Sequence, residues 1–320
     1  MRHSDPPPIL AIIVPCYIEA PVLPATDKEL SALLENLKSV GKVAECSYVV
    51  YVDDRSDDNT WEVICGLTGN HSKGIRLSRH SGHQVALMAG MEYALDSFDC
   101  CITIDADLQD DISVIPNMID AYRRGADIVY GVRTNRMCDS RTKRITAAGF
   151  YSTMHKLGVE CVSNHADFRL MSSRAVEDLL EYKERNLFLR GIVPLLGYDQ
   201  EMVYYKRKER TAGITKYPLK KMLDFAADGI TSFSVTPVRM LLWLGLAVTA
   251  IGLGIGIYTL VRHFMGETIE GWTSLMLSIW FCTGVLLIGL GIIGEYIGKI
   301  YIEVKQRPRY KISDKTESPK

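Results

Sequence analysis

Short apolar runs recur along the chain as far as residue 131, and longer amphipathic segments separate them. The runs have the length and the β-branched, aromatic character of buried strands. They span residues 9–14, 47–53, 74–78, 100–105 and 127–131, and the amphipathic segments lie near residues 26–40, 57–67, 83–96 and 112–124. This alternation predicts an α/β domain with a mostly parallel sheet and helices on both faces.

Acidic residues follow several of the predicted strands, and two explanations compete for them. Asp57, Asp58, Asp110 and Asp111 come directly before helical segments, where carboxylates satisfy free amides and the helix dipole. We therefore expect these four residues to be helix caps rather than ligands.

The sequence DADLQ at residues 105–109 ends an apolar run and offers hard oxygen ligands. An open α/β sheet binds its ligands at the carboxyl ends of its strands. Asp105, Asp107 and Gln109 are thus candidates for holding a divalent cation on a diphosphate.

Two uncharged apolar stretches, at residues 240–261 and 273–294, follow the α/β region. At about 1.5 Å per residue each reaches roughly 33 Å, enough to cross a bilayer. Basic residues flank the pair on both outer sides, whereas the loop between the stretches is nearly neutral. The positive-inside bias then predicts a multi-pass protein of the inner (plasma) membrane, with the catalytic domain and both termini cytoplasmic. The glycine spacing within the spans is compatible with a homo-oligomer.

Before the first span, apolar residues repeat at steps of three and four beside several lysines. This predicts an amphipathic helix over residues 216–236, which either packs against the domain or lies at the membrane surface. The chain then divides into a proline-rich tether without a secretory signal, a catalytic domain, this helix, two spans and a tail. Their limits are residues 1–8, 9–215, 216–236, 237–298 and 299–320.

The formal net charge is −1, from 37 basic and 38 acidic residues. A balance of this kind argues against nucleic acid as a partner.

Taken in order, the strand ends carry motifs that resemble one group of family 2 glycosyltransferases. That group loads a sugar onto a polyprenyl phosphate and includes the bactoprenol glucosyltransferases and, more distantly, dolichol-phosphate mannose synthase. The motifs are VPCYIEA (14–20), VDDRSDD (52–58), SRHSGHQVALMAG (78–90), DADLQDD (105–111), YGVR (130–133), ADFRLMSSR (166–174), ERNLFLRG (184–191) and ERTAGITKY (209–217). The resemblance continues through both apolar stretches to residue 310.

The resemblance implies a GT-A domain, which is Rossmann-like, and a UDP-sugar donor. It assigns Asp105, Asp107 and Gln109 to Mg²⁺ or Mn²⁺, and the remaining donor contacts to Pro15, Glu19, Asp53, Asp54, Arg210 and Lys216. The loop that carries His80 and His83 closes over the nucleotide in this group, and for His83 we expect hydrogen bonding or a helix start rather than metal binding.

The implied acceptor is a polyprenyl phosphate in the lipid bilayer. Because its phosphate is largely dianionic at neutral pH, it can attack without first losing a proton. Asp167, the candidate for a base, could equally orient the acceptor or pair structurally with Arg169. The candidates for binding the lipid phosphate are the basic residues Arg133, Lys143, Arg144 and Arg169.

Two residues depart from the motifs of the group. Ile18 replaces the asparagine of VPxYNE, and Arg55 replaces the glycine of VDDGS. Both changes require local adjustment if those positions form tight turns.

The sequence thus favours inverting, metal-dependent transfer of a single hexose, with glucose expected before N-acetylglucosamine, for modification of a cell-envelope glycan. One alternative is a processive polysaccharide synthase, although no QxxRW element is present. The other is a catalytically inactive membrane adaptor that retains the fold.

Overall fold

The computed structural model describes residues 6–67, 71–134, 165–184, 188–206 and 271–316, with scattered positions between 238 and 265. The chain forms two compact units. The first contains residues 1–151, 160–216 and 306–320, and the second contains residues 152–159 and 217–305. The proposed amphipathic helix at 216–236 and the candidates Lys143, Arg144, Arg210 and Lys216 lie outside the described residues.

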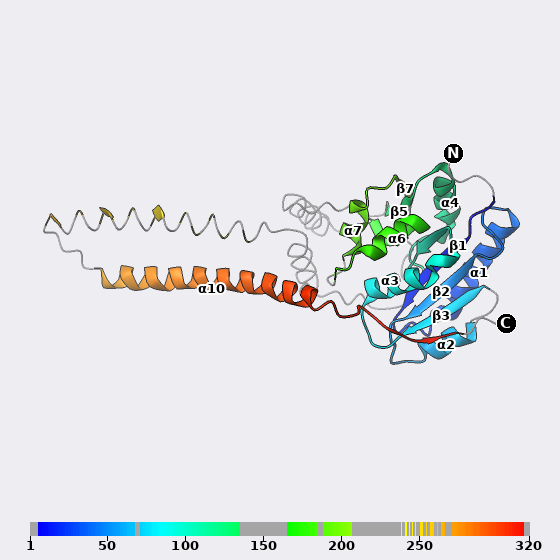
Figure 1. Ribbon diagram of the computed structural model, residues 1–320, viewed down its shortest axis with the longest axis horizontal. Coiled ribbons are helices and arrows are strands. Elements are labelled where there is room, and N and C mark those ends of the chain that lie inside the picture. The colour runs from blue at the N-terminus through cyan, green and yellow to red at the C-terminus, as the bar shows by residue number, and fades with distance from the viewer. Residues whose placement is uncertain are drawn as a thin grey trace. The chain divides into compact units, whose positions relative to one another are not determined.

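The first unit is built on a sheet with the strand order β7-β5-β6-β4-β1-β2-β3-β8 (Figure 1). The strands are β1 (Leu10–Cys16), β2 (Tyr48–Asp53), β3 (Ser72–Leu77), β4 (Cys100–Thr103), β5 (Ile128–Arg133), β6 (His165–Ser172), β7 (Gln200–Tyr205) and β8 (Ile312–Lys315). All pairings are parallel except those of β6 with β4 and β5 and that of β8 with β3. This confirms the predicted mostly parallel α/β sheet, including its first five strands.

Helices connect the strands where the amphipathic segments predicted them (Figure 1). The predicted helices are α1 (Leu23–Ser39), α2 (Thr60–Leu67), α3 (His83–Ala94) and α4 (Ile115–Arg124). The helices α6 (Ser173–Glu181) and α7 (Leu189–Leu195) were not predicted, and short 3₁₀ turns form η1 (Leu95–Ser97) and η2 (Ile112–Val114). The buried stripe of α1 follows the helical period, with Leu23, Leu30, Leu34 and Leu37 at most 2% exposed.

The two faces of β1 pack against different helices. Leu10, Ile12 and Val14 share a core with α1, α2 and α4, whereas Ile13 faces α3. Gly90 of α3 lies so close to the sheet that an added Cβ would come within 2.5 Å of Ile13 Cγ2. The sheet is therefore covered on both faces, as the continuous apolar strands require.

Strand β8 comes from the C-terminal segment and adds to the edge of the sheet. Arg76 of β3 lies opposite Asp314, and Gly74 exchanges hydrogen bonds with Thr316. The sequence placed residues 299–320 in a separate tail, whereas residues 306–320 belong to the first unit. With β8 in place, β3 is no longer the edge of the sheet, and β8 itself, a strand of four residues, takes that position.

The second unit contains the long helix α10 (Trp272–Val304). It contains the predicted span 273–294 and continues ten residues beyond it. The segment Phe281–Val304 is 24 residues long and is long and apolar enough to cross a membrane. Most of the span predicted at 240–261 lies outside the described residues.

Candidate active site

The turn after β4 holds the predicted metal ligands at the carboxyl edge of the sheet. Leu108 N donates to Asp105 O at 3.3 Å, and Gln109 N donates to Asp107 Oδ1 at 3.2 Å. Leu108 has a φ of +44°, in the left-handed region. The chain reverses sharply here, which leaves Asp105 and Asp107 partly exposed while Gln109 is 6% exposed.

These residues fit a divalent cation that is shared with a substrate. Across the described segments, no three His, Cys, Asp or Glu side chains form a group that could hold a metal alone. Mg²⁺ in nucleotide sites is commonly held by one or two carboxylates together with substrate phosphates, rather than by a complete protein cage. Asp105 and Asp107 offer such a partial set of hard oxygen ligands.

The electrostatics of Asp105 also favour a cation. Its partial burial raises the pKa of this carboxyl, and the nearby carboxylates of Asp167, Asp110 and Asp107 raise it further, against the lowering effect of His83. Positive charge placed here would relieve this repulsion between carboxylates.

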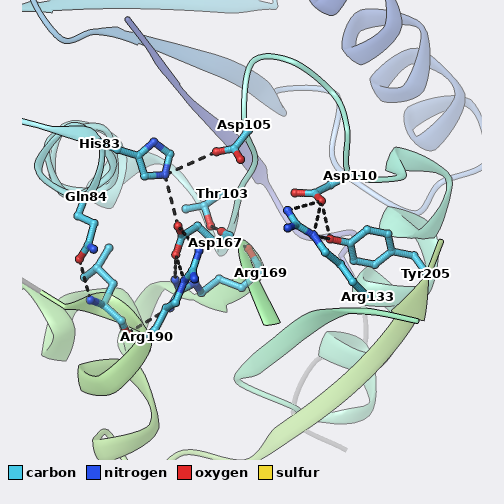
Figure 2. Close-up of polar contacts among 11 residues, drawn as sticks. His83, Gln84, Thr103, Asp105, Asp110, Arg133, Asp167, Arg169, Arg190 and Tyr205 are labelled. Atoms are coloured by element: carbon cyan, nitrogen blue, oxygen red, sulfur yellow. Dashed lines mark hydrogen bonds and ion pairs between the residues drawn. The ribbon is translucent and has the colours of Figure 1, made fainter. Parts of the chain in front are cut away.

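Asp167 of β6 lies at the centre of a second cluster, shown in Figure 2. Arg169 Nη2 donates to Asp167 Oδ1 at 2.9 Å, and Arg190 Nη2 approaches Asp167 Oδ2 at 3.2 Å. His83 Nε2 lies 3.5 Å from both Asp167 Oδ2 and Asp105 Oδ1. His83, the first residue of α3, therefore links the turn after β4 to Asp167.

The three cationic partners fix the ionisation of Asp167. Burial alone would raise the pKa of this carboxyl, but the hydrogen bond from His83 and the charges of Arg190 and Arg169 hold it well below its usual range. For His83, burial acts to lower the pKa of the imidazole. The hydrogen bond to Asp167 and the charge of Asp105 raise that pKa by more, so it lies above its usual value. Asp167 is thus a carboxylate throughout the physiological pH range and a weak proton acceptor.

Asp110 forms a third cluster on the other side of the turn (Figure 2). It is 2% exposed and accepts hydrogen bonds from Arg133 Nη2 at 2.8 Å and from the Tyr205 hydroxyl at 2.6 Å. The expectation that Asp110 caps a helix is therefore wrong, because its side chain is engaged across the sheet. Asp111 does cap η2, through Ser113 N at 3.1 Å, and Asp58 accepts from Thr60 N at the start of α2.

The acids of VDDRS hold two loops in place. Asp53 is fully buried, accepts from Ser56 N at 2.9 Å and lies 3.0 Å from Arg76 Nε. Asp54 accepts from the backbone amides of Ser81 and Gly82, both at 2.8 Å. These contacts join the loop after β2 to the start of α3.

The remaining donor candidates lie in the first loop. Pro15 is buried in β1 opposite Val52, and Glu19 N donates to Thr60 Oγ1 at 3.1 Å in the loop that leads to α1. The assignment of Pro15, Glu19, Asp53 and Asp54 to the nucleotide-sugar stays a prediction.

Both departures from the motifs lie at left-handed backbone positions. Ile18 has a φ of +57° and Arg55 a φ of +59°. Asparagine and glycine tolerate this region, whereas a β-branched residue there is strained. Ile18 N nevertheless donates to Ser56 Oγ at 3.0 Å, so the two loops keep their contact.

Sequence reasoning missed Arg190 and Tyr205 as members of these clusters. Arg190 lies within ERNLFLRG, a motif that was noted without a role for this arginine. Tyr205 gave no comparable signal. Arg169, expected on a lipid phosphate, is 2% exposed and faces Asp167, which is the structural pairing that the sequence left open.

Comparison with known proteins extends over nearly the whole chain. Residues 11–180 match the family described as Glycosyl transferase family 2, and residues 236–300 match the GtrB C-terminal hairpin. The hairpin match and the apolar helix α10 together indicate association with a membrane.

Several curated relatives are similar along their full length. The uncharacterized glycosyltransferase YkoT of Bacillus subtilis is 50% identical over 98% of this chain and 93% of its own. The bactoprenol glucosyl transferase of Shigella phage SfII is 40% identical over 94% of this chain and 96% of its own. The prophage bactoprenol glucosyl transferase homolog of Escherichia coli is 38% identical over 94% and 97%, respectively.

Similarity to solved structures is weaker. Glucosyl-3-phosphoglycerate synthase from Mycobacterium tuberculosis, in complex with Mn²⁺, UDP and glucosyl-3-phosphoglycerate, has a TM-score of 0.44 and 14% identity over 70% of this chain and 78% of its own. A similarity of this size supports no conclusion about ligands. The family match over more than half of the chain and the full-length relatives show that this protein is a glycosyltransferase and belongs to glycosyl transferase family 2.

Proposed function

We propose that the protein transfers one glucosyl unit from UDP-glucose to a polyprenyl phosphate such as undecaprenyl phosphate. The observation that carries this proposal is the similarity to proteins named bactoprenol glucosyl transferases over 94% of this chain, which reaches beyond the catalytic domain into the C-terminal hairpin. UDP-N-acetylglucosamine is the second donor to test. The product would serve in modification of a cell-envelope glycan.

The donor diphosphate belongs at the turn after β4 in this proposal. Asp105 and Asp107 would hold Mg²⁺ or Mn²⁺ there, with Gln109 beside them. The cation supplies stabilisation of the negative charge that develops on the departing diphosphate. Within the turn, Leu108 N donates to the backbone carbonyl of Asp105, and Gln109 N donates to the carboxylate of Asp107.

The acceptor phosphate attacks C1 of the sugar from the side opposite the diphosphate. A phosphate oxygen forms the new bond to C1 while the bond from C1 to the diphosphate oxygen breaks with its electron pair, which releases UDP and inverts the anomeric centre. The attacking group is already an anion, so no base is needed. Asp167, held as a carboxylate by three cationic partners, orients His83 and Arg190 instead of accepting a proton.

The reaction is assigned to the cytoplasmic face of the membrane. Basic residues precede the first predicted span and follow the second, and the short loop between the spans is nearly neutral. The positive-inside bias then supports two crossings, with the catalytic domain cytoplasmic.

The test uses the full chain purified in detergent, with UDP-glucose, Mg²⁺ and undecaprenyl phosphate. We expect an acid-labile lipid that carries one glucose, loss of the product with a chelator, and its return with Mg²⁺ or Mn²⁺. Asp107→Asn should abolish the product. Asp111→Asn is the matched control, because asparagine can also cap η2, and it should keep activity close to that of the wild type.

Other outcomes would contradict the proposal in distinct ways. Lipids with a ladder of added sugars would indicate processive synthesis, and binding of UDP-glucose without transfer would indicate an inactive adaptor. Full turnover in the presence of a chelator would remove the metal from the mechanism.

A further inference from the structure

The start of α7 carries an arginine into the Asp167 cluster, and its position is firmly held. Leu189 N donates to Gln84 Oε1 of α3 at 2.9 Å, and Arg169 Nη1 reaches Leu189 O at 3.4 Å. These bonds fix the residue directly before Arg190. Figure 2 shows the Arg190 side chain directed at Asp167 from this anchored point.

The charges around Asp167 do not balance. Arg169 and Arg190 each bring one positive charge to a single carboxylate, so the three groups carry a net charge of +1 even before His83 is counted. His83 lies between this carboxylate and that of Asp105, so it is shared with a second acid and is left out of the count. An anion is the ligand that this excess suits.

The two arginines differ in how a ligand could reach them. Arg169 is 2% exposed and makes the shorter contact with Asp167, at 2.9 Å. Arg190 is 35% exposed, and its contacts with Asp167 are longer, at 3.2 and 3.3 Å. Asp167 therefore keeps a buried partner in Arg169, while Arg190 is accessible to a ligand from solvent.

The location of Arg190 relative to the metal-binding turn indicates which anion it would meet. Asp105, His83, Asp167 and Arg190 form a row of contacts, with Asp105 at one end and Arg190 at the other (Figure 2). The diphosphate of the donor belongs at the Asp105 end. A phosphate that attacks from the opposite side of the sugar would approach the Arg190 end.

Resting on the proposed function, we infer that Arg190 binds the phosphate of the lipid acceptor. The planar guanidinium can contact Asp167 along one edge and phosphate oxygens along another, and this fork geometry suits phosphate better than a lysine ammonium does. Asp167 and Arg169 are positioning residues in this arrangement, since they hold the guanidinium in place.

The test compares Arg190→Ala, Arg190→Lys and the wild type in initial-rate assays in which each substrate is varied separately. Arg190→Ala should raise KM for undecaprenyl phosphate by about tenfold or more and leave KM for UDP-glucose within about twofold. Arg190→Lys, which keeps the charge without the fork, should give a smaller rise, about threefold. Arg124→Ala is the control, because Arg124 is an exposed arginine paired with Glu201 away from these clusters.

Three results would overturn the inference: a rise in KM for UDP-glucose alone, no change in kcat or in either KM, or a fall in kcat with both KM values unchanged. The last would mean that Arg190 acts only on the structure of the cluster. Should Arg190→Ala fail to fold, Arg190→Lys decides between the same outcomes. If the wild type transfers no glucose to lipid phosphate, the proposed function fails instead, and that failure is visible before any variant is measured.

Discussion

Two aspartates near the carboxyl edge of the sheet, the buried Asp110 and the partly buried Asp167, are both bound by arginine, yet their surroundings differ. Asp110 has one guanidinium, from Arg133, and the neutral hydroxyl of Tyr205. Asp167 has two guanidinium groups and an imidazole. The Asp110 cluster is electrically balanced, whereas the Asp167 cluster carries excess positive charge.

This difference in charge indicates that the Asp110 cluster stabilises the fold, whereas the Asp167 cluster is suited to bind a ligand. A balanced buried pair stabilises the position of its own members, and removing one partner leaves an uncompensated charge. A cluster with excess positive charge and a partly exposed arginine is completed by an anion. We therefore expect changes at Asp110 to act mainly on stability, by releasing Arg133, and changes at Asp167 to act on catalysis as well.

The largest effect is expected from Asp167→Asn. The amide cannot hold two arginines by charge, so we expect transfer to fall at least about 100-fold. The buried charge of Arg169 also loses its counterion, which should lower the free energy of unfolding by about 3 kcal/mol. Activity per folded molecule, measured with melting temperature in parallel, separates the two losses. Activity within tenfold of the wild type would contradict the distinction between the clusters.

The stability part of that loss should depend on pH. The pKa of Asp167 is lowered by folding, so its contribution to stability is fully present above the unfolded pKa, near about 4, and is lost as pH falls through the lower folded value. Below pH 5, the difference in melting temperature between the wild type and Asp167→Asn should shrink as the pH falls. A difference that grows in acid would reverse the assigned sign.

Asp110→Asn should destabilise the protein by about 2 kcal/mol, because Arg133 and Tyr205 both lose a charged acceptor. Turnover per folded molecule should fall less than tenfold. Tyr205→Phe removes one hydrogen bond and leaves the ion pair, so about 1 kcal/mol is expected. The melting temperatures of the two variants test this order, and an equal loss in both would mean that the ion pair adds nothing.

The smallest effect concerns the strained loops beside the clusters. Arg55→Gly and Ile18→Asn place tolerant residues at left-handed positions, and each should stabilise the protein by about 1 kcal/mol. Arg79→Gly is the control, since Arg79 is also an exposed loop arginine but does not have a positive φ. It should be neutral or slightly destabilising. If all three variants stabilise the protein, relief of backbone strain is not the cause of the stabilisation.

Much of the fold could be predicted because the signals are local. The apolar runs that became β1 to β5 and the amphipathic stripes between them depend on spacing within one segment. The acids after β4 were identified for the same reason, since a strand end positions the residues that follow it.

Antiparallel strands β6 and β8 could not be found in this way. Gly74 and Thr316, which join β3 to the C-terminal segment, are 242 residues apart in the chain. Nothing within residues 312–315 distinguishes an edge strand from a tail, because its pairing depends on which edge the folded sheet leaves open. The same limit explains why Asp110 looked like a cap.

The amino-acid sequence determined the α/β pattern, the carboxylates at the end of β4 and the apolar length of the membrane segment, because each rests on residue type and short-range period. Only the tertiary structure decided which cation meets which carboxylate. Asp167, His83 and Arg190 come from three separate elements, and the charge of a buried group is set by neighbours in space rather than along the chain. For that reason Arg190, the arginine assigned to the acceptor phosphate, was identified from the structure and not from the sequence.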